Sequence, residues 1–570
     1  MAESPLNGGS CLLFNNMLRK ILISFGILFF ALSCEKGTEQ DDIKYVNGFV
    51  KEFTINGKTV KNGATAVNVD GDDVLITIKF SSEVDKDHID ISRFSITKLS
   101  EVFQLVDNPD PKSISIRITE KLPKYEYYTF SVFKGKNFGL NLIDSYSFKF
   151  LTVMDESDKF DRIPSDDLLT LVQEKTFRYF WDHAHPVSGL SRERLGSGNI
   201  VTSGGSGFGV MTIPVAIERG FITRDEGAQR MLTIATFLDE KTEKFHGAFS
   251  HWINGETGKA IAFSEKDNGA DLVETALLVQ GLLAVQQYFN LDNATESVIR
   301  QKITAIWEAV EWDWFINSSN ALFWHWSPNY GWEMNMNISG WNEALIVYVL
   351  AASSPTHPID KSVYDAGWAR NGGMKNGKKF YEIALPLGPD YGGPMFFAHY
   401  SFMGLDPRGL TDSYADYWEQ NVAHAKINHA YCKANPKGHY GYSDRCWGLT
   451  ASDIQNGYTA SSPTNDKGTI APTAALASMP YTPQESMKAL EYFYYVLGDR
   501  LFKEYGFVDS FSLEKRWFAS SYIAIDQGPI VVMIENHRTG LLWDNFMKNK
   551  DVQKGLEKLG FTYTEKVIKI

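Results

Sequence analysis

The chain has 570 residues, of which 44% are hydrophobic and 14% aromatic, and its formal net charge is −13 at pH 7. This length allows a large core and more than one domain. An acidic chain without a basic cluster argues against nucleic acid as a partner. The 14 Trp, 26 Tyr and 37 Phe could serve as flat platforms for sugars, although a large core also uses aromatic residues.

Residues 1–34 have the features of a bacterial lipoprotein signal. Arg19 and Lys20 precede an apolar run over 21–32 that is too short to span a bilayer comfortably. The run ends in an Ala-Leu-Ser-Cys sequence at Cys34, which predicts lipidation of that cysteine. Residues 35–42 are polar and acidic, as a tether would be. We therefore expect a lipid anchor in the bacterial cell envelope, on the outer membrane or facing the periplasm, with Met17 as an alternative start.

Residues 43–153 predict a small all-β domain. Strand-like runs occur at 74–80, 113–118, 127–133 and 146–152, separated by Gly, Asn, Asp and Pro. This spacing is typical of a β-sandwich. The runs at 76–85 and 146–152 resemble bacterial Ig-like modules, and no catalytic motif accompanies them. We expect a spacer or docking role for this domain and a linker over the acidic residues 154–164.

From residue 165 to residue 570 the hydrophobic pattern becomes helical. An all-α toroid of paired inner and outer helices fits so many helices better than a bundle does. The glycine-rich residues 203–209 lack the features of a phosphate-binding loop, so we expect close backbone packing at the start of a helix. Helices are predicted at 168–182, 210–219, 224–240, 271–289, 298–316, 341–352, 412–432, 471–477, 483–497 and 529–547.

One acidic stretch stands out within the helical region. Asp267, Asp271 and Glu274 are spaced to share one face if the helix begins ahead of them. The residues after Asp271 are almost all apolar, and carboxylates are seldom buried without a partner or a function. Alternatively, Asp267 and Asp271 only cap the helix and interact with its positive end.

Two further carboxylates lie in apolar surroundings. Glu343 lies at the start of an apolar helix. Alternatively, it is only a helix-terminal charge that interacts with the helix dipole. Asp526 precedes Pro529, where we expect it to cap the helix that follows. A tryptophan-rich loop ahead of Glu343 suits stacking against sugar rings. The candidate sugar platforms, each of which could equally be a core residue, are Trp324, Trp326, Trp332 and Trp447.

The sequence contains no motif for a zinc site or a serine nucleophile. The histidines show no zinc-binding spacing, and no Gly-x-Ser-x-Gly nucleophile motif occurs, so we expect no metal, no cofactor and no serine nucleophile. Cys432 and Cys446 could pair in an oxidising compartment or remain free and buried. Paired carboxylates and aromatic rings remain, which is the equipment of glycoside hydrolysis.

Several motifs from about residue 166 to the C-terminus resemble, in order, the glucoamylase-like bacterial family placed in glycoside hydrolase family 144. The resemblance does not include the Ig-like region. The motifs are Ser206–Gly209, Glu218–Gly220, Asp271–Leu278, Trp341–Leu345, Ser354–Pro358, Ala434–Gly438, Cys446–Asp453, Gly468–Ala475, Ile525–Pro529 and Met533–Asn536.

The resemblance implies an (α/α)6 barrel that hydrolyses β-1,2-glucan with inversion at the anomeric carbon. It also implies that Glu343 is the general acid and that Asp271 is the first choice for the base, supported by Glu274 and Asp267. The base could also act through water or a substrate hydroxyl. The alternatives are a hydrolase of another glucan and a surface lipoprotein that binds glycans without cleaving them.

Overall fold

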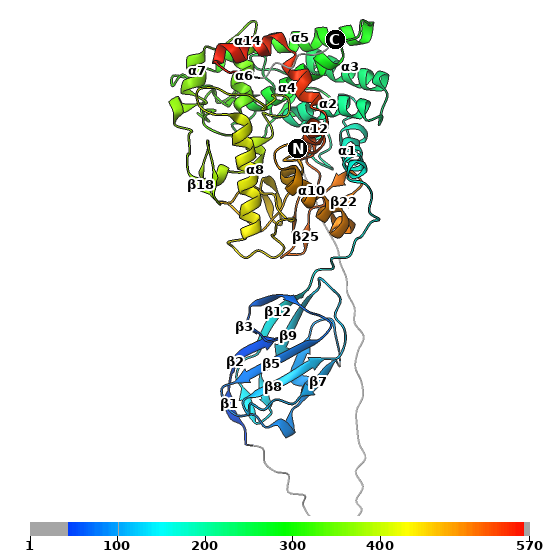
Figure 1. Ribbon diagram of the computed structural model, residues 1–570, viewed down its shortest axis with the longest axis vertical. Helices are drawn as coiled ribbons and strands as arrows, with labels where there is room; N and C mark the ends of the chain where they lie inside the picture. Colours follow the sequence, from blue (N-terminus) through cyan, green and yellow to red (C-terminus); the bar gives the residue numbers. More distant parts are fainter. Residues whose placement is uncertain (1–43, 101, 564–570) are drawn as a thin grey trace, which may run out of the picture. The chain divides into compact units, whose positions relative to one another are not determined.

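The computed structural model describes residues 44–100 and 102–563, and the chain divides into two compact units, Met1–Val153 and Met154–Ile570 (Figure 1). The predicted signal with Cys34 and the tether over 35–42 lie outside the described residues. None of the helices in the described ranges is long and apolar enough to cross a membrane.

The first unit is rich in β-strands, as the sequence predicts. Three of the four predicted strands have the predicted limits, and the fourth ends one residue early, at Val132. In the strand Val74–Phe80, buried residues alternate with more exposed ones, which is the pattern of a half-buried strand. The strands are β1 Val46–Gly48, β2 Val50–Ile55, β3 Lys58–Val60, β4 Thr65–Val69, β5 Val74–Phe80, β6 Phe94–Ile96, β7 Phe103–Val106, β8 Ser113–Ile118, β9 Tyr127–Val132, β10 Gly135–Asn137, β11 Leu140–Leu142 and β12 Tyr146–Thr152.

Two larger sheets and one small sheet form this unit. Their strand orders are β3-β2-β5-β8-β7, β4-β12-β9-β6 and β1-β11-β10. Phe53 of β2 packs on Phe148 of β12, with ring centroids 5.1 Å apart, and edge-on against Phe130 of β9 at 6.3 Å. The core of the first unit therefore lies between the two larger sheets.

Residues 154–164, predicted as a linker, pack against the helical unit. The Lys159 amide donates to the Tyr495 carbonyl (2.6 Å), and the Ile163 amide donates to the Tyr495 hydroxyl (3.0 Å). Phe160 stacks against Tyr494 at 4.8 Å. These contacts make the segment the first part of the second unit.

The second unit is rich in helices, and short two- and three-stranded sheets join several of them (Figure 1). Most predicted helices are present with shifted ends, and the one predicted at 224–240 has the predicted limits. The helices are α1 Ser165–Asp182, α2 Ser203–Glu218, α3 Arg224–Glu240, α4 Leu272–Tyr288, α5 Ala294–Glu308, α6 Leu345–Ser353, α7 Lys361–Ala366, α8 Tyr417–Ala434, α9 Pro472–Leu476, α10 Pro483–Glu491, α11 Gly498–Leu501, α12 Ala524–Arg538, α13 Leu541–Met547 and α14 Lys550–Leu559.

Fully buried and half-buried helices alternate along the first half of this unit. Helices α2, α4 and α6 are buried around almost their whole circumference, whereas α1, α3 and α5 each bury one side. Helices α9 and α12 are also mostly buried. A helix that is apolar on all sides is suited to the inside of a large unit.

Glycines allow α2 and α4 to touch through their backbones. A Cβ atom on Gly207 would lie 2.3 Å from the Leu277 carbonyl oxygen, and one on Gly281 would lie 2.1 Å from the Gly207 carbonyl oxygen. The predicted close packing of the glycine-rich residues is confirmed. These residues are themselves helical, however, so α2 begins at Ser203 rather than near residue 210.

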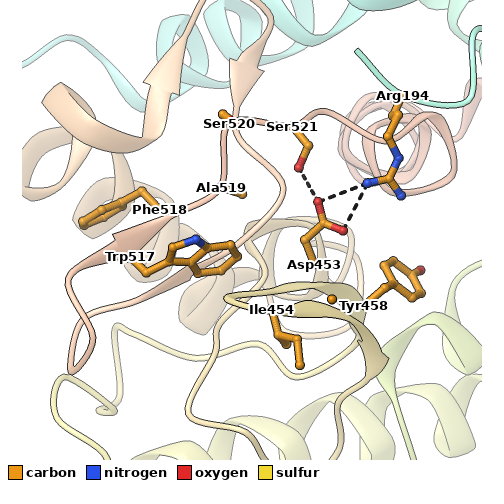
Figure 2. A pocket seen from close by; sticks show the side chains of 10 residues that line it. Arg194, Asp453, Ile454, Tyr458, Trp517, Phe518, Ala519, Ser520 and Ser521 are labelled. Carbon is orange, nitrogen blue, oxygen red and sulfur yellow. Dashed lines mark hydrogen bonds and ion pairs between the residues drawn. The ribbon is translucent and has the colours of Figure 1, made fainter. Parts of the chain in front are cut away.

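The loops between helices contain short strands that shape one region of particular interest. The hairpin of β20 Ala451–Ile454 and β21 Gly457–Ala460, together with β25 Trp517–Phe518, borders a cavity of about 510 Å³ (Figure 2). The remaining short strands are β13 Ile200–Thr202, β14 Trp252–Asn254, β15 Ala260–Ile261, β16 Ala270–Asp271, β17 His325–Trp326, β18 Lys379–Phe380, β19 Ile383–Ala384, β22 Phe502–Lys503, β23 Gly506–Phe507 and β24 Phe511–Ser512.

Candidate active site

The start of α4 is held by backbone pairing on both sides. Strand β16 pairs with β17 so that Asp271 lies opposite His325. The Asp271 amide also donates to the Phe249 carbonyl (2.8 Å), which brings the neighbouring His251 to the same place. Two histidines that are distant in sequence thus meet at the first turn of α4.

Asp271 is fully buried and uses both of its carboxylate oxygens. Its Oδ1 accepts from the amides of Val273 and Glu274 (3.0 Å each), which caps α4. Its Oδ2 accepts from His251 Nδ1 (3.1 Å), and His325 Nε2 lies 3.6 Å away. The proposed helix cap is therefore confirmed for Asp271, and it coexists with an ion pair.

The pKa shifts of this pair favour its charged form. Burial alone would raise the pKa of Asp271, but the hydrogen bond from His251 and the nearby histidines lower it below its ordinary value. Burial would lower the pKa of His251, yet the charge of Glu274 and the contact with Asp271 raise it to about 9. At neutral pH the pair is an imidazolium beside a carboxylate.

Glu274 points from the first turn of α4 toward the start of α2. Its Oε2 accepts from the Gly204 amide (2.8 Å) and from the Thr202 hydroxyl (3.4 Å). A Cβ atom on Gly204 would lie 2.4 Å from this oxygen, so the contact requires glycine there. Burial and the charge of Asp271 raise the pKa of Glu274, although His251 and the Gly204 amide act against this rise.

Asp267 lies in a loop and not on the helix face that the sequence predicts. Helix α4 begins only at Leu272, because residues 270 and 271 pair as a strand. Asp267 nevertheless reaches the cluster, where its Oδ2 lies 3.4 Å from His325 Nε2. It caps no helix, and its buried Oδ1 has no hydrogen-bond partner. Burial and the charge of Asp271 raise its pKa to about 7.

Glu343 occupies the turn just before α6, since the helix starts at Leu345 rather than at the predicted 341. The Asn342 side chain accepts from the Ala344 amide (2.9 Å), and the Ser401 hydroxyl donates to the Glu343 carbonyl. The Glu343 side chain is partly exposed. Desolvation raises the pKa of Glu343 to about 7. The charges of Glu274 and Asp271 add to this rise, and a backbone hydrogen bond opposes it.

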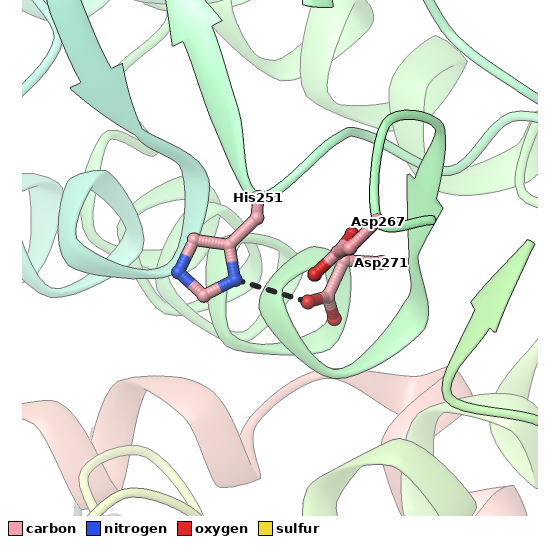
Figure 3. Close-up of side chains that lie close together, drawn as sticks. All are labelled: His251, Asp267 and Asp271. Atoms are coloured by element: carbon pink, nitrogen blue, oxygen red, sulfur yellow. Dashed lines mark hydrogen bonds and ion pairs between the residues drawn. The ribbon is translucent and has the colours of Figure 1, made fainter. Parts of the chain in front are cut away.

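Among the described residues, one group could hold a metal ion: His251, Asp267 and Asp271, whose donor atoms lie within 4.8 Å of one another (Figure 3). The sequence could not reveal this group by spacing, because the three residues come from two separate segments. A metal ion needs a neutral histidine. In this structure His251 Nδ1 donates to Asp271 Oδ2 (3.1 Å), so we describe the group as an ion pair.

A second cluster of buried carboxyl groups was not predicted. Asp526 is in the first turn of α12, which begins at Ala524. The prediction that Asp526 caps a helix beginning at Pro529 is therefore wrong. The Tyr400 hydroxyl donates to Asp526 Oδ1 (3.4 Å), and Asp526 Oδ2 has no partner. Burial and the charge of Asp509 raise the pKa of Asp526 well above its usual range.

Tyr400 lies between the two clusters. Burial raises its pKa, and the charges of Asp526, Glu343 and Glu274 add to this effect. No sequence signal pointed to Tyr400 or Asp509, because only the fold brings them to the start of α12.

The four candidate tryptophans differ in exposure. Trp447 is 0% exposed, which places its ring in the core. Trp326 and Trp332 are partly buried and pack on Trp314, with ring centroids 5.5 and 4.6 Å apart. Trp324 is partly buried beside His325 at 5.8 Å. For Trp447 the structure favours the core alternative, whereas the other three retain partly exposed rings.

Together these groups provide the components of acid–base catalysis. Glu343 has a pKa that lets it keep a proton near neutral pH, while Asp271 stays ionised. Carboxyl groups whose environments separate their pKa values are suited to serve as one acid and one base. Cys432 and Cys446 take no part here; both are buried and free.

Comparisons with known proteins agree with this chemistry. A family model, Glycoamylase, described as "Putative glucoamylase", matches residues 335–550. Over 417 residues the chain is 49% identical to the exo β-1,2-glucooligosaccharide sophorohydrolase (non-reducing end) of Parabacteroides distasonis. That match covers 69% of this chain and 58% of the relative, so the chain spans less than two thirds of the length of this curated protein.

Two solved structures are similar over most of the chain. The endo-β-1,2-glucanase of Chitinophaga pinensis, in complex with sophorotriose and glucose, has 50% identity and a TM-score of 0.69, covering 70% of this chain and 99% of that one. A β-1,2-glucanase of Parabacteroides distasonis has 40% identity and a TM-score of 0.68, covering 90% of this chain and 73% of that one. The second match includes residues of the β-rich unit, because Met154–Ile570 alone makes up less than 90% of the chain.

Proposed function

The chain belongs to the bacterial β-1,2-glucanase family known as glycoside hydrolase family 144, and from this membership we propose that it hydrolyses β-1,2-glucan. The products would be sophorose or short β-1,2-glucooligosaccharides. The observation that carries the proposal is the 50% identity to an endo-β-1,2-glucanase that is covered over 99% of its length.

The proposed mechanism inverts the anomeric carbon and uses Glu343 as the general acid. Its raised pKa supports this role, because the acid must hold a proton until the leaving oxygen receives it. Its partial exposure lets a substrate reach it.

We assign the base to the pair Asp267 and Asp271, with Glu274 supporting the charge of the pair. Sequence reasoning placed Asp271 first, but the helix start and His251 engage both of its oxygens. Asp271 therefore keeps the pair anionic, and we assign to the Asp267 carboxylate, one oxygen of which has no hydrogen-bond partner, the step that takes the proton from water or a substrate hydroxyl.

A finer architecture is proposed for each of the two units. We propose that the helical unit is an (α/α)6 toroid with α2, α4 and α6 in its inner ring, and that the β-rich unit is an Ig-like sandwich. The alternation of fully buried and half-buried helices supports the toroid. The core between two sheets, one antiparallel and one with a single parallel pair formed by β12 and β4, supports the sandwich.

Product analysis with linear β-1,2-glucan, with starch beside it, tests the proposed function. We expect sophorose or short β-1,2-linked products from the first substrate and none from starch. NMR of freshly released sugar should show α anomers at the newly formed ends, since inversion converts the β linkage. Retained β anomers would refute inversion, and release of sugar from starch alone would refute the substrate.

We also propose that Cys34 carries a lipid that anchors the protein in the bacterial envelope. A substitution Cys34→Ala is expected to move the protein from the membrane fraction to the soluble fraction, because no acyl chain could then be attached. Cys11→Ala, ahead of the apolar run, is the matched control and should stay with the membrane. A Cys34→Ala protein that remains membrane-bound would contradict the anchor.

A further inference from the structure

The cavity beside the hairpin β20–β21 has a charged wall that is held rigidly. Asp453 accepts from Arg194 Nη1 at both carboxylate oxygens (3.3 Å each) and from the Ser521 hydroxyl (2.5 Å), as Figure 2 shows. Arg194 also contacts Glu193 through Nε (2.9 Å). Donors and acceptors are thus fixed side by side at one edge of the cavity.

Aromatic side chains form further parts of the cavity wall. Trp517 and Phe518 of β25 are partly exposed and line it, and Tyr458 lies across the hairpin from Asp453 with 49% of its surface exposed. Within the described residues no aromatic ring is paired with Trp517, in contrast to Trp332, which packs on Trp314 and Phe323. Trp517 therefore presents a ring that another molecule can cover.

Backbone contacts connect this cavity to the candidate active site. Arg194 forms a β-bridge with Ile523, directly ahead of α12. The next residue, Ala524, packs on α2, since a Cβ atom added to Gly205 would lie 2.8 Å from the Cβ atom of Ala524. The neighbouring Gly204 amide is the one that binds Glu274. The cavity and the site are therefore built on adjoining ends of α2 and α12.

Side chains make a second connection. The Asp453 amide donates to Asp509 (2.7 Å), the charge of Asp509 acts on Asp526, and the Tyr400 hydroxyl donates to Asp526 (3.4 Å). The charge of Glu343 in turn helps to raise the pKa of Tyr400. This series of residues links one wall of the cavity to the surroundings of Glu343.

The charge of the cavity selects a neutral ligand. Arg194 is paired with both Glu193 and Asp453, so two carboxylates face one guanidinium and an anion would meet net negative charge. A volume of about 510 Å³ lies within the range of about 300–1,000 Å³ that is typical of ligand sites. A flat ring and a fixed pair of donor and acceptor groups suit a neutral polyhydroxylated ring.

We propose that this cavity is a sugar subsite in which Trp517 stacks on, and Asp453 and Arg194 hydrogen-bond to, a glucose unit of the glucan chain remote from the cleaved bond. The inference rests on the proposed β-1,2-glucanase function and deepens it. The subsite gives long chains an advantage over short ones, because only a chain that extends past Glu343 reaches Trp517.

Kinetics on two substrate lengths test the subsite. With linear β-1,2-glucan, Trp517→Ala is expected to raise KM about tenfold, whereas with the shortest oligosaccharide that the wild type cleaves KM should change much less. Trp517→Phe should recover part of the loss, because a smaller ring still stacks. The control is Leu291→Ala, half exposed beyond the C-terminus of α4 and thus about 25 Å from Asp271 along a 17-residue helix.

A binding measurement keeps the test independent of turnover. In the Glu343→Gln background, isothermal titration with linear β-1,2-glucan should show a dissociation constant about ten times higher with Trp517→Ala or Tyr458→Ala. Tyr458 is half exposed, so its substitution tests the cavity even if Trp517→Ala does not fold. Unchanged binding, or equal KM changes for long and short substrates, would overturn the subsite. If the wild type fails to cleave β-1,2-glucan, the proposed function itself is refuted.

Discussion

Replacing Glu343 with glutamine is expected to lower kcat on linear β-1,2-glucan by at least about a hundredfold, because general acid catalysis typically contributes that factor or more. Glutamine has nearly the same shape as glutamate but cannot give a proton to the leaving oxygen. The turn is fixed by Asn342 and Ser401 through backbone groups, so the substitution leaves these contacts in place. The thermal midpoint of the variant should therefore stay close to that of the wild type.

Glu308→Gln is the matched control for this experiment. Glu308 is exposed at the end of α5, and its substitution should change neither kcat nor the thermal midpoint. Near-normal turnover of Glu343→Gln, with the control unchanged, would remove Glu343 from the mechanism.

The pH profile gives a second measurement on the same carboxyl group. Its pKa of about 7 means that Glu343 is protonated below that pH and loses its proton above it. In the wild type, kcat/KM should therefore fall about tenfold per pH unit above pH about 7. This alkaline limb should be absent from the residual activity of Glu343→Gln, because glutamine does not titrate.

The sequence predicted regular elements well wherever burial follows a local pattern. The strands β5, β8 and β12 have their predicted limits; buried residues alternate with more exposed ones in β5, whereas β8 is buried at almost every position. Helix α2 was predicted several residues too short, because glycine is a poor helix former. Its first turns are stabilised by contact with α4, where the Gly207 and Leu277 backbones approach too closely for any side chain.

The candidate site was predicted in its residues more than in its geometry. Asp271 and Glu274 lie at a helix start, as the apolar pattern indicates, but the strand pairing with His325 moves Asp267 off the helix. The contact between His251 and Asp271 depends on a chain reversal that local sequence does not encode. For the same reason the role predicted for Asp526, that of a helix cap, was wrong, since its partners come from distant segments.

Replacing Asp271 with asparagine should separate its structural role from its chemical one. Asparagine is as good a helix cap as aspartate, so the amides of Val273 and Glu274 keep an acceptor and α4 keeps its start. The negative charge that faces His251 is lost. We expect kcat on β-1,2-glucan to fall about a hundredfold, because the pair Asp267 and Asp271 that serves as the base loses the charge of Asp271, with little change in the thermal midpoint.

The same variant should move the alkaline limb of the pH profile. The charge of Asp271 helps to raise the pKa of Glu343, so Asp271→Asn should lower that pKa and shift the limb toward acid. Azide then distinguishes a base from a purely electrostatic residue, because this anion can attack the sugar without being deprotonated. If the pair Asp267 and Asp271 is the base, azide should partly restore turnover in Asp271→Asn and in Asp267→Asn, but not in Glu343→Gln acting on glucan. If the alkaline limb shifts but kcat stays near normal, Asp271 only holds His251 in place and is not part of the base. Asp526 would then be the next candidate for the base. Its Oδ2 has no hydrogen-bond partner, and its Oδ1 accepts from Tyr400, on which the charge of Glu343 also acts.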